Sequence, residues 1–173
     1  MEIVENLEQW QAEFREGWLA HYESRGEIDW DKYPKIRNSS APSGPAVDLS
    51  QSRLALITSA GGYLKDDQAP FDAPDPLGDY GIRLFPSTTP PDRIAYAHDH
   101  FDHMAVDQDP QVLLPLRHLA EMVADGRLGD LAPSTISFMG YQPDVGRVVN
   151  EMIPAIIEVA QTEEVDAALL VPA

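Results

Sequence analysis

The chain contains no cysteine among its 173 residues. This absence excludes disulfide bonds, thiolate metal ligands and a cysteine nucleophile within the sequence. Basic residues are also scarce, because 12 Lys and Arg stand against 29 Asp and Glu, for a formal net charge of -17. Nucleic acids and anionic membranes are bound by clustered Lys and Arg, so we expect neither as a partner.

Long hydrophobic runs are missing as well. No stretch of about 18 apolar residues occurs, so we expect no membrane span. The first residues, MEIVENLEQWQAEF, are acidic and amphipathic, whereas a signal peptide begins basic and then turns apolar. Apolar residues still make up 43% of the chain, enough for a hydrophobic core. We therefore expect a cytoplasmic globular protein, and the length favours a single main domain.

The N-terminal region has the pattern of an amphipathic helix over residues 2–24, because bulky apolar residues recur every three or four positions. These residues are Ile3, Leu7, Trp10, Phe14, Trp18 and Tyr22. Gly26 ends the pattern, and a loop rich in Pro, Ser and Gly follows at 39–48. We expect residues 1–46 to form a helical arm and loop, which packs on the main body or on a second subunit.

Residues 47–173 alternate between strand-like and helix-like segments. Strands are predicted at 54–58, 80–87, 93–98, 134–140 and 165–173. Helices are predicted at 115–126 and 144–164; Asp144 would cap the second helix and Pro154 would kink it. This alternation predicts an α/β domain with an open, mostly parallel sheet and flanking helices.

Ligands of such sheets gather at the carboxyl ends of the strands. Four predicted strands end in segments that carry polar or small residues: TSAGG, AHDHFDH, FMGY and LVPA. After the first strand, Ser59, Gly61 and Gly62 could present backbone N–H groups to an anionic ligand, although such glycines also simply form turns. Tyr141 would wall a pocket or belong to the core. In a parallel sheet all four segments share one edge.

The second of these segments holds His98, Asp99, His100, Asp102 and His103. This H-x-H-x-D-H spacing is that of binuclear zinc hydrolases, and imidazole and carboxylate groups suit zinc. The later ligands of that motif are absent, since the one histidine that follows lies inside a predicted helix. We therefore predict no bound metal. Two readings stay open: a single metal held by two of the histidines, and a polar loop whose histidines bond to neighbouring aspartates.

Four segments, in order, resemble the selenoprotein B family, whose members are subunits of glycine, sarcosine, betaine and D-proline reductases. They are LALITSAGGYLKDDQAPFD, HDHFDH, PLRHLAEMVADGRLGDLAPSTISFMGY and VDAALLVPA, and the resemblance spans roughly residues 47–173. It implies an oxidoreductase that cleaves a C–N bond reductively. It also implies a pyruvoyl-type partner subunit that holds the amine substrate, and a thiol reductant.

The resemblance makes the histidine segment the family's loop beside the redox residue. Proton transfer would there fall to His98, His100 and His103, and Asp99 and Asp102 could hold substrate. Together with the edge residues named above, the expected substrate-binding residues are Ser59, Gly61, Gly62, Asp99, Asp102 and Tyr141. In the family a selenocysteine or cysteine directly follows the strand that ALLVPA resembles, whereas this sequence stops at Ala173.

Selenocysteine is encoded by UGA, ordinarily a stop codon. We therefore expect selenocysteine to follow Ala173 in the full-length product, and this chain to carry neither the catalytic nucleophile nor a cofactor. A core strand with no covering element also predicts a marginal, homo-oligomeric or aggregation-prone 173-residue form. Two other functions stay open: a metal-dependent hydrolase that uses HDHFDH, and a non-catalytic binding or assembly protein.

Overall fold

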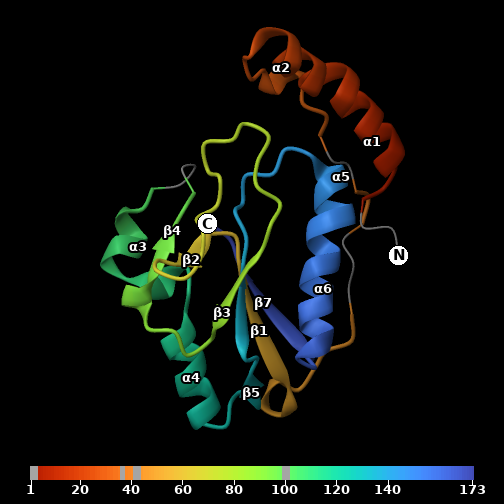
Figure 1. Cartoon of the computed structure of the whole chain (residues 1–173). Coiled ribbons are helices and arrows are strands. Elements are labelled where there is room, and N and C mark those ends of the chain that lie inside the picture. The colour runs from red at the N-terminus through yellow and green to blue at the C-terminus, as the bar shows by residue number, and fades with distance from the viewer. Residues whose placement is uncertain (1–3, 36–37, 41–43, 99–101) are drawn as a thin grey trace.

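The computed structural model describes residues 4–35, 38–40, 44–98 and 102–173. Its centre is an open five-stranded sheet with helices on both faces and a helical arm at one end (Figure 1). The strands of this sheet are β1 (Arg53–Thr58), β3 (Arg83–Pro86), β5 (Asp130–Leu131), β6 (Ser134–Ser137) and β7 (Ala167–Val171). The expected α/β class is thereby confirmed.

β1 is the strand on which the sheet is built. It pairs in parallel with β7 along one side, and with β5 and then β6 along the other. β3 lies beyond β6 and runs antiparallel to it, so the sheet is mostly but not wholly parallel. Every residue from Leu54 to Thr58 is buried, as expected for a continuous apolar strand covered on both faces.

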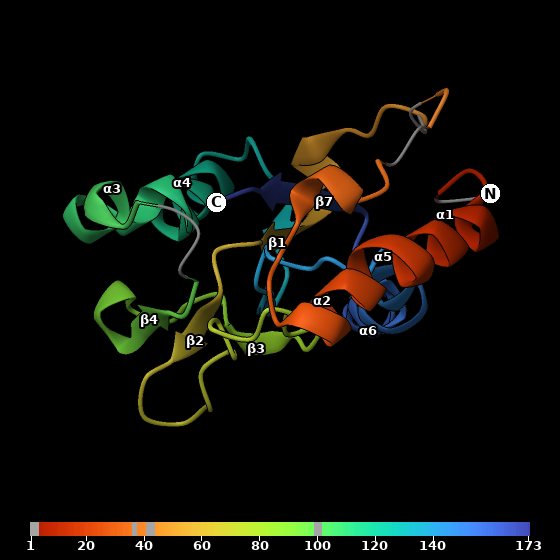
Figure 2. The same cartoon turned by 90° about the horizontal axis from the view of Figure 1, so that it is seen from above.

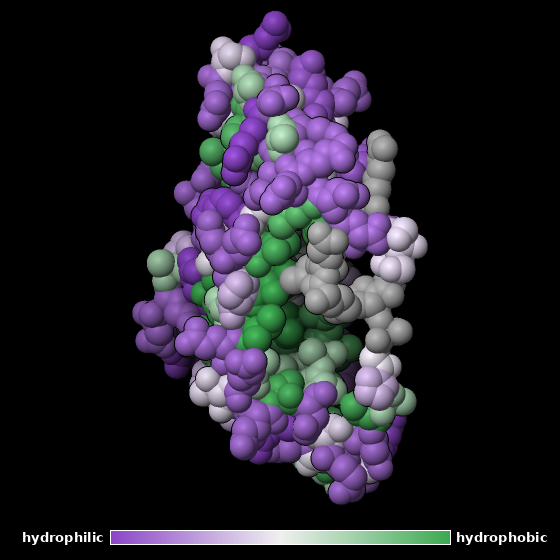
Figure 3. All heavy atoms as spheres, turned by 90° about the vertical axis from the view of Figure 1, so that its right-hand side faces the viewer, coloured by the Kyte–Doolittle hydropathy of each residue, from purple (hydrophilic) through white to green (hydrophobic). Residues whose placement is uncertain are grey.

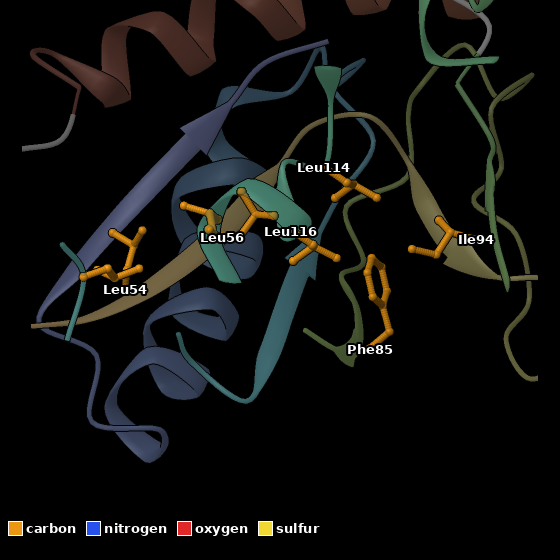
Figure 4. Packing of buried hydrophobic residues seen from close by; sticks show 8 residues of the cluster. Leu54, Leu56, Phe85, Ile94, Leu114 and Leu116 are labelled. Atoms are coloured by element: carbon orange, nitrogen blue, oxygen red, sulfur yellow. The ribbon is translucent and has the colours of Figure 1, made fainter. Parts of the chain in front are cut away.

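The two faces of β1 contact different helices. Leu54 and Leu56 belong to a cluster with Leu116 and Leu119 of α4 (Leu116–Ala124). Figure 4 shows this cluster, in which Phe85 and Ile94 close the far end. Ala55 and Ile57 face the other way, where Ile156 and Val159 of α6 (Ile153–Thr162) pack against them.

The helix predicted at 144–164 is confirmed, with an irregularity near its start. Asp144 caps it by accepting hydrogen bonds from the N–H groups of Gly146 and Arg147. The helix then runs as α5 (Val145–Arg147), a π-helical segment (Val148–Met152) and α6. Pro154 lies in the first turn of α6. Proline has no N–H to donate. The π-helical segment ends at Met152, two residues before Pro154, where the sequence predicted a kink.

The placement of residues 93–98 corrects a prediction. β4 (Ile94–Tyr96) does not join the main sheet but pairs antiparallel with β2 (Gly62–Leu64) in a separate two-stranded sheet. A three-residue apolar strand carries no information about its partner. The three-residue β2 and the two-residue β5 were not predicted. The remaining helical elements are α3 (Met104–Gln108) and 3-10 turns at Trp30–Lys32, Leu49–Gln51, Pro91–Arg93 and Pro110–Val112.

The N-terminal arm consists of α1 (Leu7–Phe14), a π-helical segment (Arg15–Leu19) and α2 (Ala20–Arg25). It begins later than predicted, because Asn6 has a left-handed backbone with φ 57°. Gly26 ends α2 with φ 68°, as expected of a C-terminal glycine.

The arm packs on the main body beside the start of α5 (Figures 1 and 2). Its apolar stripe forms a stack of rings, with centroids 5.0 Å apart between Trp10 and Phe14 and 5.4 Å apart between Phe14 and Trp18. Val145 is buried against this stack. The Tyr33 hydroxyl donates to the Pro143 carbonyl across the same junction, at 2.9 Å. Within the described ranges, no helix combines the length and apolar character needed to cross a membrane.

We predict that Leu56→Ala lowers the free energy of unfolding by about 2–5 kcal/mol, because the fully buried side chain leaves a cavity. The control is Val112→Ala, since Val112 is 50% exposed and such changes stay within about 0.5 kcal/mol. Urea unfolding followed by circular dichroism measures both. Equal losses would contradict the described core.

Candidate functional site at the carboxyl edge of the sheet

The ends of β1 and β7 are joined at the carboxyl edge of the main sheet. The N–H of Ser59 donates to the carbonyl of Val171 at 3.2 Å. Two residues further along, the N–H of Ala173 donates to Ser59 Oγ at 2.9 Å. The expected proximity of Ser59 and Ala173 is thus confirmed. Ala173, two residues after β7, is held by the side chain of Ser59, the residue that directly follows β1.

His98 reaches the same place from the second sheet. A Cβ added to Gly140 would lie 2.9 Å from His98 Nε2, 3.3 Å from Ser59 Cβ and 3.3 Å from the Ser59 carbonyl oxygen. The imidazole and Ser59 therefore flank one point, which is open only because residue 140 has no side chain. His98 is 4% exposed. Proton transfer by His98 stays a prediction.

Gly61 is the junction that brings His98 there. Its N–H donates to the Phe138 carbonyl and its carbonyl accepts from the Ala97 N–H, both at 2.9 Å. Its φ is +66°, and an added Cβ would lie 2.5 Å from the Ala97 oxygen. Only glycine tolerates both conditions. The main sheet and the β2–β4 sheet are therefore tied together one residue before His98.

The amide groups of Ser59, Ala60 and Gly61 are already used within the protein. Ser59 and Gly61 donate as described, and the Ala60 N–H donates to Thr58 Oγ1 at 3.3 Å. Gly62 lies opposite Tyr96 in the two-stranded sheet. The structure thus gives Gly61 a packing role, with its N–H directed to Phe138. Substrate binding by Ser59, Gly61 and Gly62 stays a prediction.

The histidine segment is described in part, since Asp99 and His100 lie outside the described residues. His103 Nε2 donates to the His98 carbonyl at 2.8 Å. Asp102 accepts from the Met104 N–H at 2.9 Å, at the first turn of α3. His103 thus ties the start of α3 to the backbone of His98, and Asp102 supports the first turn of that helix.

The described residues contain no group of three His, Asp or Glu arranged for a metal ion. Because two members of the motif are not among them, the absence of metal stays a prediction. The two other readings of the segment, a single metal and a polar loop, likewise stay predictions.

Tyr141 follows Gly140 but its side chain is directed elsewhere. Its hydroxyl donates to the Pro76 carbonyl at 3.0 Å, and its ring meets that of Trp30 edge-on at 6.1 Å. Burial raises the pKa of the phenol. The side chain thus links the arm to the loop before β3, and a substrate-binding role stays a prediction.

Tyr96 and Gly140 are two residues of this region that sequence reasoning missed. Tyr96 packs with Val171 against Ala60 and Val106. Its hydroxyl is buried without a hydrogen-bond partner among the described residues. Burial, followed by the charge of Asp107, raises its pKa to about 12. A tyrosine inside a short apolar run and a glycine after a strand carry no sequence signal of such contacts.

Gly61→Ala should destabilise the protein more than Gly26→Ala. Both positions have φ near +67° (+66° and +68°), but Gly26 has no heavy atom within 4 Å of an added Cβ, whereas Gly61 faces a backbone oxygen. The left-handed backbone alone costs an alanine roughly 1–2 kcal/mol. Chemical unfolding of the two variants isolates the additional cost of the clash. Equal losses would show that residues 61 and 97 can separate freely.

Tyr96→Phe should leave stability unchanged or raise it by up to about 1 kcal/mol, because it removes a buried hydroxyl without a described partner. Tyr33→Phe should cost about 1 kcal/mol, because it removes the hydrogen bond to Pro143. Urea unfolding at pH 7 compares the two variants. A loss for Tyr96→Phe as large as that for Tyr33→Phe would contradict the assignment.

The same variants have a pH signature. Burial raises the pKa values of both Tyr33 and Tyr96 to about 12, above about 10 in the unfolded chain. The folded state thus holds these protons more tightly, so their stabilisation is complete below pH 10 and is lost as pH rises toward 12. Tyr96→Phe should reduce this loss between about pH 10 and 12, as measured by urea unfolding across that range.

Comparison with known proteins matches residues 30–173 to the family model of glycine/sarcosine/betaine reductase selenoprotein B. D-proline reductase subunit gamma of Acetoanaerobium sticklandii is 29% identical over 123 residues, which cover 71% of this chain and 49% of the relative. Glycine reductase complex component B subunit gamma of Carboxydothermus hydrogenoformans is 29% identical over 149 residues, covering 84% and 34%.

A third relative is sarcosine reductase complex component B subunit beta of Peptoclostridium acidaminophilum. It is 29% identical over 130 residues, which cover 70% of this chain and 28% of the relative. The chain thus spans about half or less of the length of these curated relatives. No solved structure matches. Because the family model covers residues 30–173, most of the chain, the protein belongs to the glycine/sarcosine/betaine reductase selenoprotein B family.

Proposed function

We propose that this chain is a subunit of a reductase complex that cleaves a C–N bond, with its reaction centre at the carboxyl edge of the main sheet. Family membership supports the reaction class, and the relatives are named as subunits or components of glycine, sarcosine and D-proline reductases. The observation that carries the location is the 2.9 Å hydrogen bond from the Ala173 N–H to Ser59 Oγ.

The nucleophile in this proposal is a selenocysteine or cysteine joined directly to Ala173. Such a residue would lie at the sheet edge, because β7 and the hydrogen bond to Ser59 direct the chain there. A selenolate or thiolate supplies the electron pair that displaces the amine nitrogen from carbon. None of the 173 residues can do this as a thiolate, since the chain has no cysteine.

The chain's own residues have supporting roles in this proposal. The Ser59 hydroxyl accepts from Ala173 and can also donate, so it both fixes the backbone and offers a proton to a neighbouring anion. His98 lies beside the same point and can deliver a proton to the departing nitrogen. A pyruvoyl-type partner subunit that holds the amine, and a thiol that restores the nucleophile, complete the proposal by family resemblance.

The test introduces a cysteine directly after Ala173 and measures its alkylation rate against pH. We expect the alkylation rate to be half-maximal at a pH below about 8.5, the pKa of an ordinary thiol. In Ser59→Ala this midpoint should rise toward about 8.5. Val112→Cys, on an exposed turn, provides an ordinary thiol in the same fold. A codon after Ala173 that encodes neither selenocysteine (UGA) nor cysteine, or a thiol that titrates like the one at position 112, would reject the proposal.

A further inference from the structure

Tyr96 lies against the two strand ends that form the candidate site. Its ring packs with Val171 against Ala60 and Val106. Ala60 directly follows Ser59, and the Val171 carbonyl accepts from the Ser59 N–H. The phenol therefore borders the place where the ends of β1 and β7 are joined.

Tyr96 and His98 point to the same side of the two-stranded sheet. Residues two apart along a strand share a face, and the pairing continues past β4, because the Ala97 N–H donates to the Gly61 carbonyl at 2.9 Å. Tyr96 also packs on the Leu54 cluster under α4, the face of the main sheet away from α6. Figure 3 shows the side that carries α6, where an apolar band runs between hydrophilic margins. The phenol thus lies away from that band, on the side of His98.

The Tyr96 hydroxyl is buried without a hydrogen-bond partner among the described residues. Side chains of those residues are sufficient to enclose it. The ring of a phenylalanine would pack equally well, and an unpaired buried hydroxyl lowers the stability of a folded protein. A phenol is protonated at neutral pH and donates a hydrogen bond. Tyr96 therefore holds a donor that lacks an acceptor in the free protein.

Ser137 provides a comparison in the same region. Its hydroxyl is also buried and unpaired in the described part of the chain. A Cβ added to Gly62 would lie 3.4 Å from Ser137 Oγ and 3.7 Å from Tyr96 Cε1, so the two side chains border one point. Ser137 is 0% exposed and pairs with Thr58 on one side and Arg83 on the other, inside the sheet. Tyr96 is partly exposed, so a ligand at the sheet edge meets the tyrosine and not the serine.

We propose that Tyr96 is a further binding residue of the reaction centre. Its hydroxyl donates a hydrogen bond to the oxygen of a carbonyl or carboxylate group next to the carbon that is attacked. This inference rests on the proposed function, in which a nucleophile joined to Ala173 attacks that carbon. The ring packs on Val106 of α3, a helix of only five residues, and a small displacement of this helix opens a path to the hydroxyl.

Alkylation of the full-length protein with cysteine directly after Ala173 tests this inference. Iodoacetamide has a carbonyl group next to its reacting carbon, whereas iodomethane has no oxygen. In both reactions the thiolate forms an S–C bond as iodide leaves, so the reagents differ in the acceptor that they offer. At a pH well above the thiol's midpoint, we expect Tyr96→Phe to lower the iodoacetamide rate about three- to tenfold. The iodomethane rate should not change.

Ser137→Ala is the matched control, because it removes the other buried, unpaired hydroxyl. Both variants should keep or raise the midpoint of urea unfolding, and Ser137→Ala should leave both alkylation rates unchanged. An unchanged iodoacetamide rate in Tyr96→Phe would overturn the inference. An equal fall with both reagents would also do so, since it marks an effect on the thiolate, and so would the same fall in Ser137→Ala.

Failure of the proposed function has a different signature. A thiol after Ala173 that titrates like that of Val112→Cys rejects the proposed function, and the role of Tyr96 with it. A shifted titration together with an unchanged ratio of the iodoacetamide and iodomethane rates in Tyr96→Phe rejects the role of Tyr96 alone.

Discussion

The backbone junction at Gly61 is the constraint on which the site depends. One residue joins the exit of β1 to Phe138 after β6 and to Ala97 after β4, in a conformation and at a distance that only glycine permits. Two sheets that share no strand are thereby held at one point. His98 follows that point directly, so main-chain hydrogen bonds of its neighbour bring it near Ser59.

This arrangement explains how a histidine from outside the main sheet comes to lie at that sheet's carboxyl edge. The rule that ligands gather at this edge correctly anticipated Ser59 and Ala173, because both end strands of the parallel set. It anticipated His98 for the wrong reason, since β4 belongs to the other sheet. His103 bonds to the His98 carbonyl and Asp102 to the Met104 N–H, so the start of α3 is tied to the backbone of His98.

The central strand is buried on both faces by different helices. Leu54 and Leu56 are packed under α4, and Ala55 and Ile57 under α6. The strand that ends at Ser59 is therefore fixed from both sides, and Ser59 begins from a rigid position at the carboxyl edge.

The sequence by itself determined the local elements. The apolar run of β1, the periodicity of α4 and α6, the Asp144 cap and the glycine that ends α2 each depend on neighbours within a turn or two of the chain. The family also followed from ordered segments of sequence. Tertiary structure alone decided the partner of β4, the antiparallel direction of β3 and the direction of the Tyr141 side chain toward Trp30 and Pro76. These features depend on which distant backbone groups remain unpaired when the sheet has formed, and a strand of three or four residues does not encode that choice.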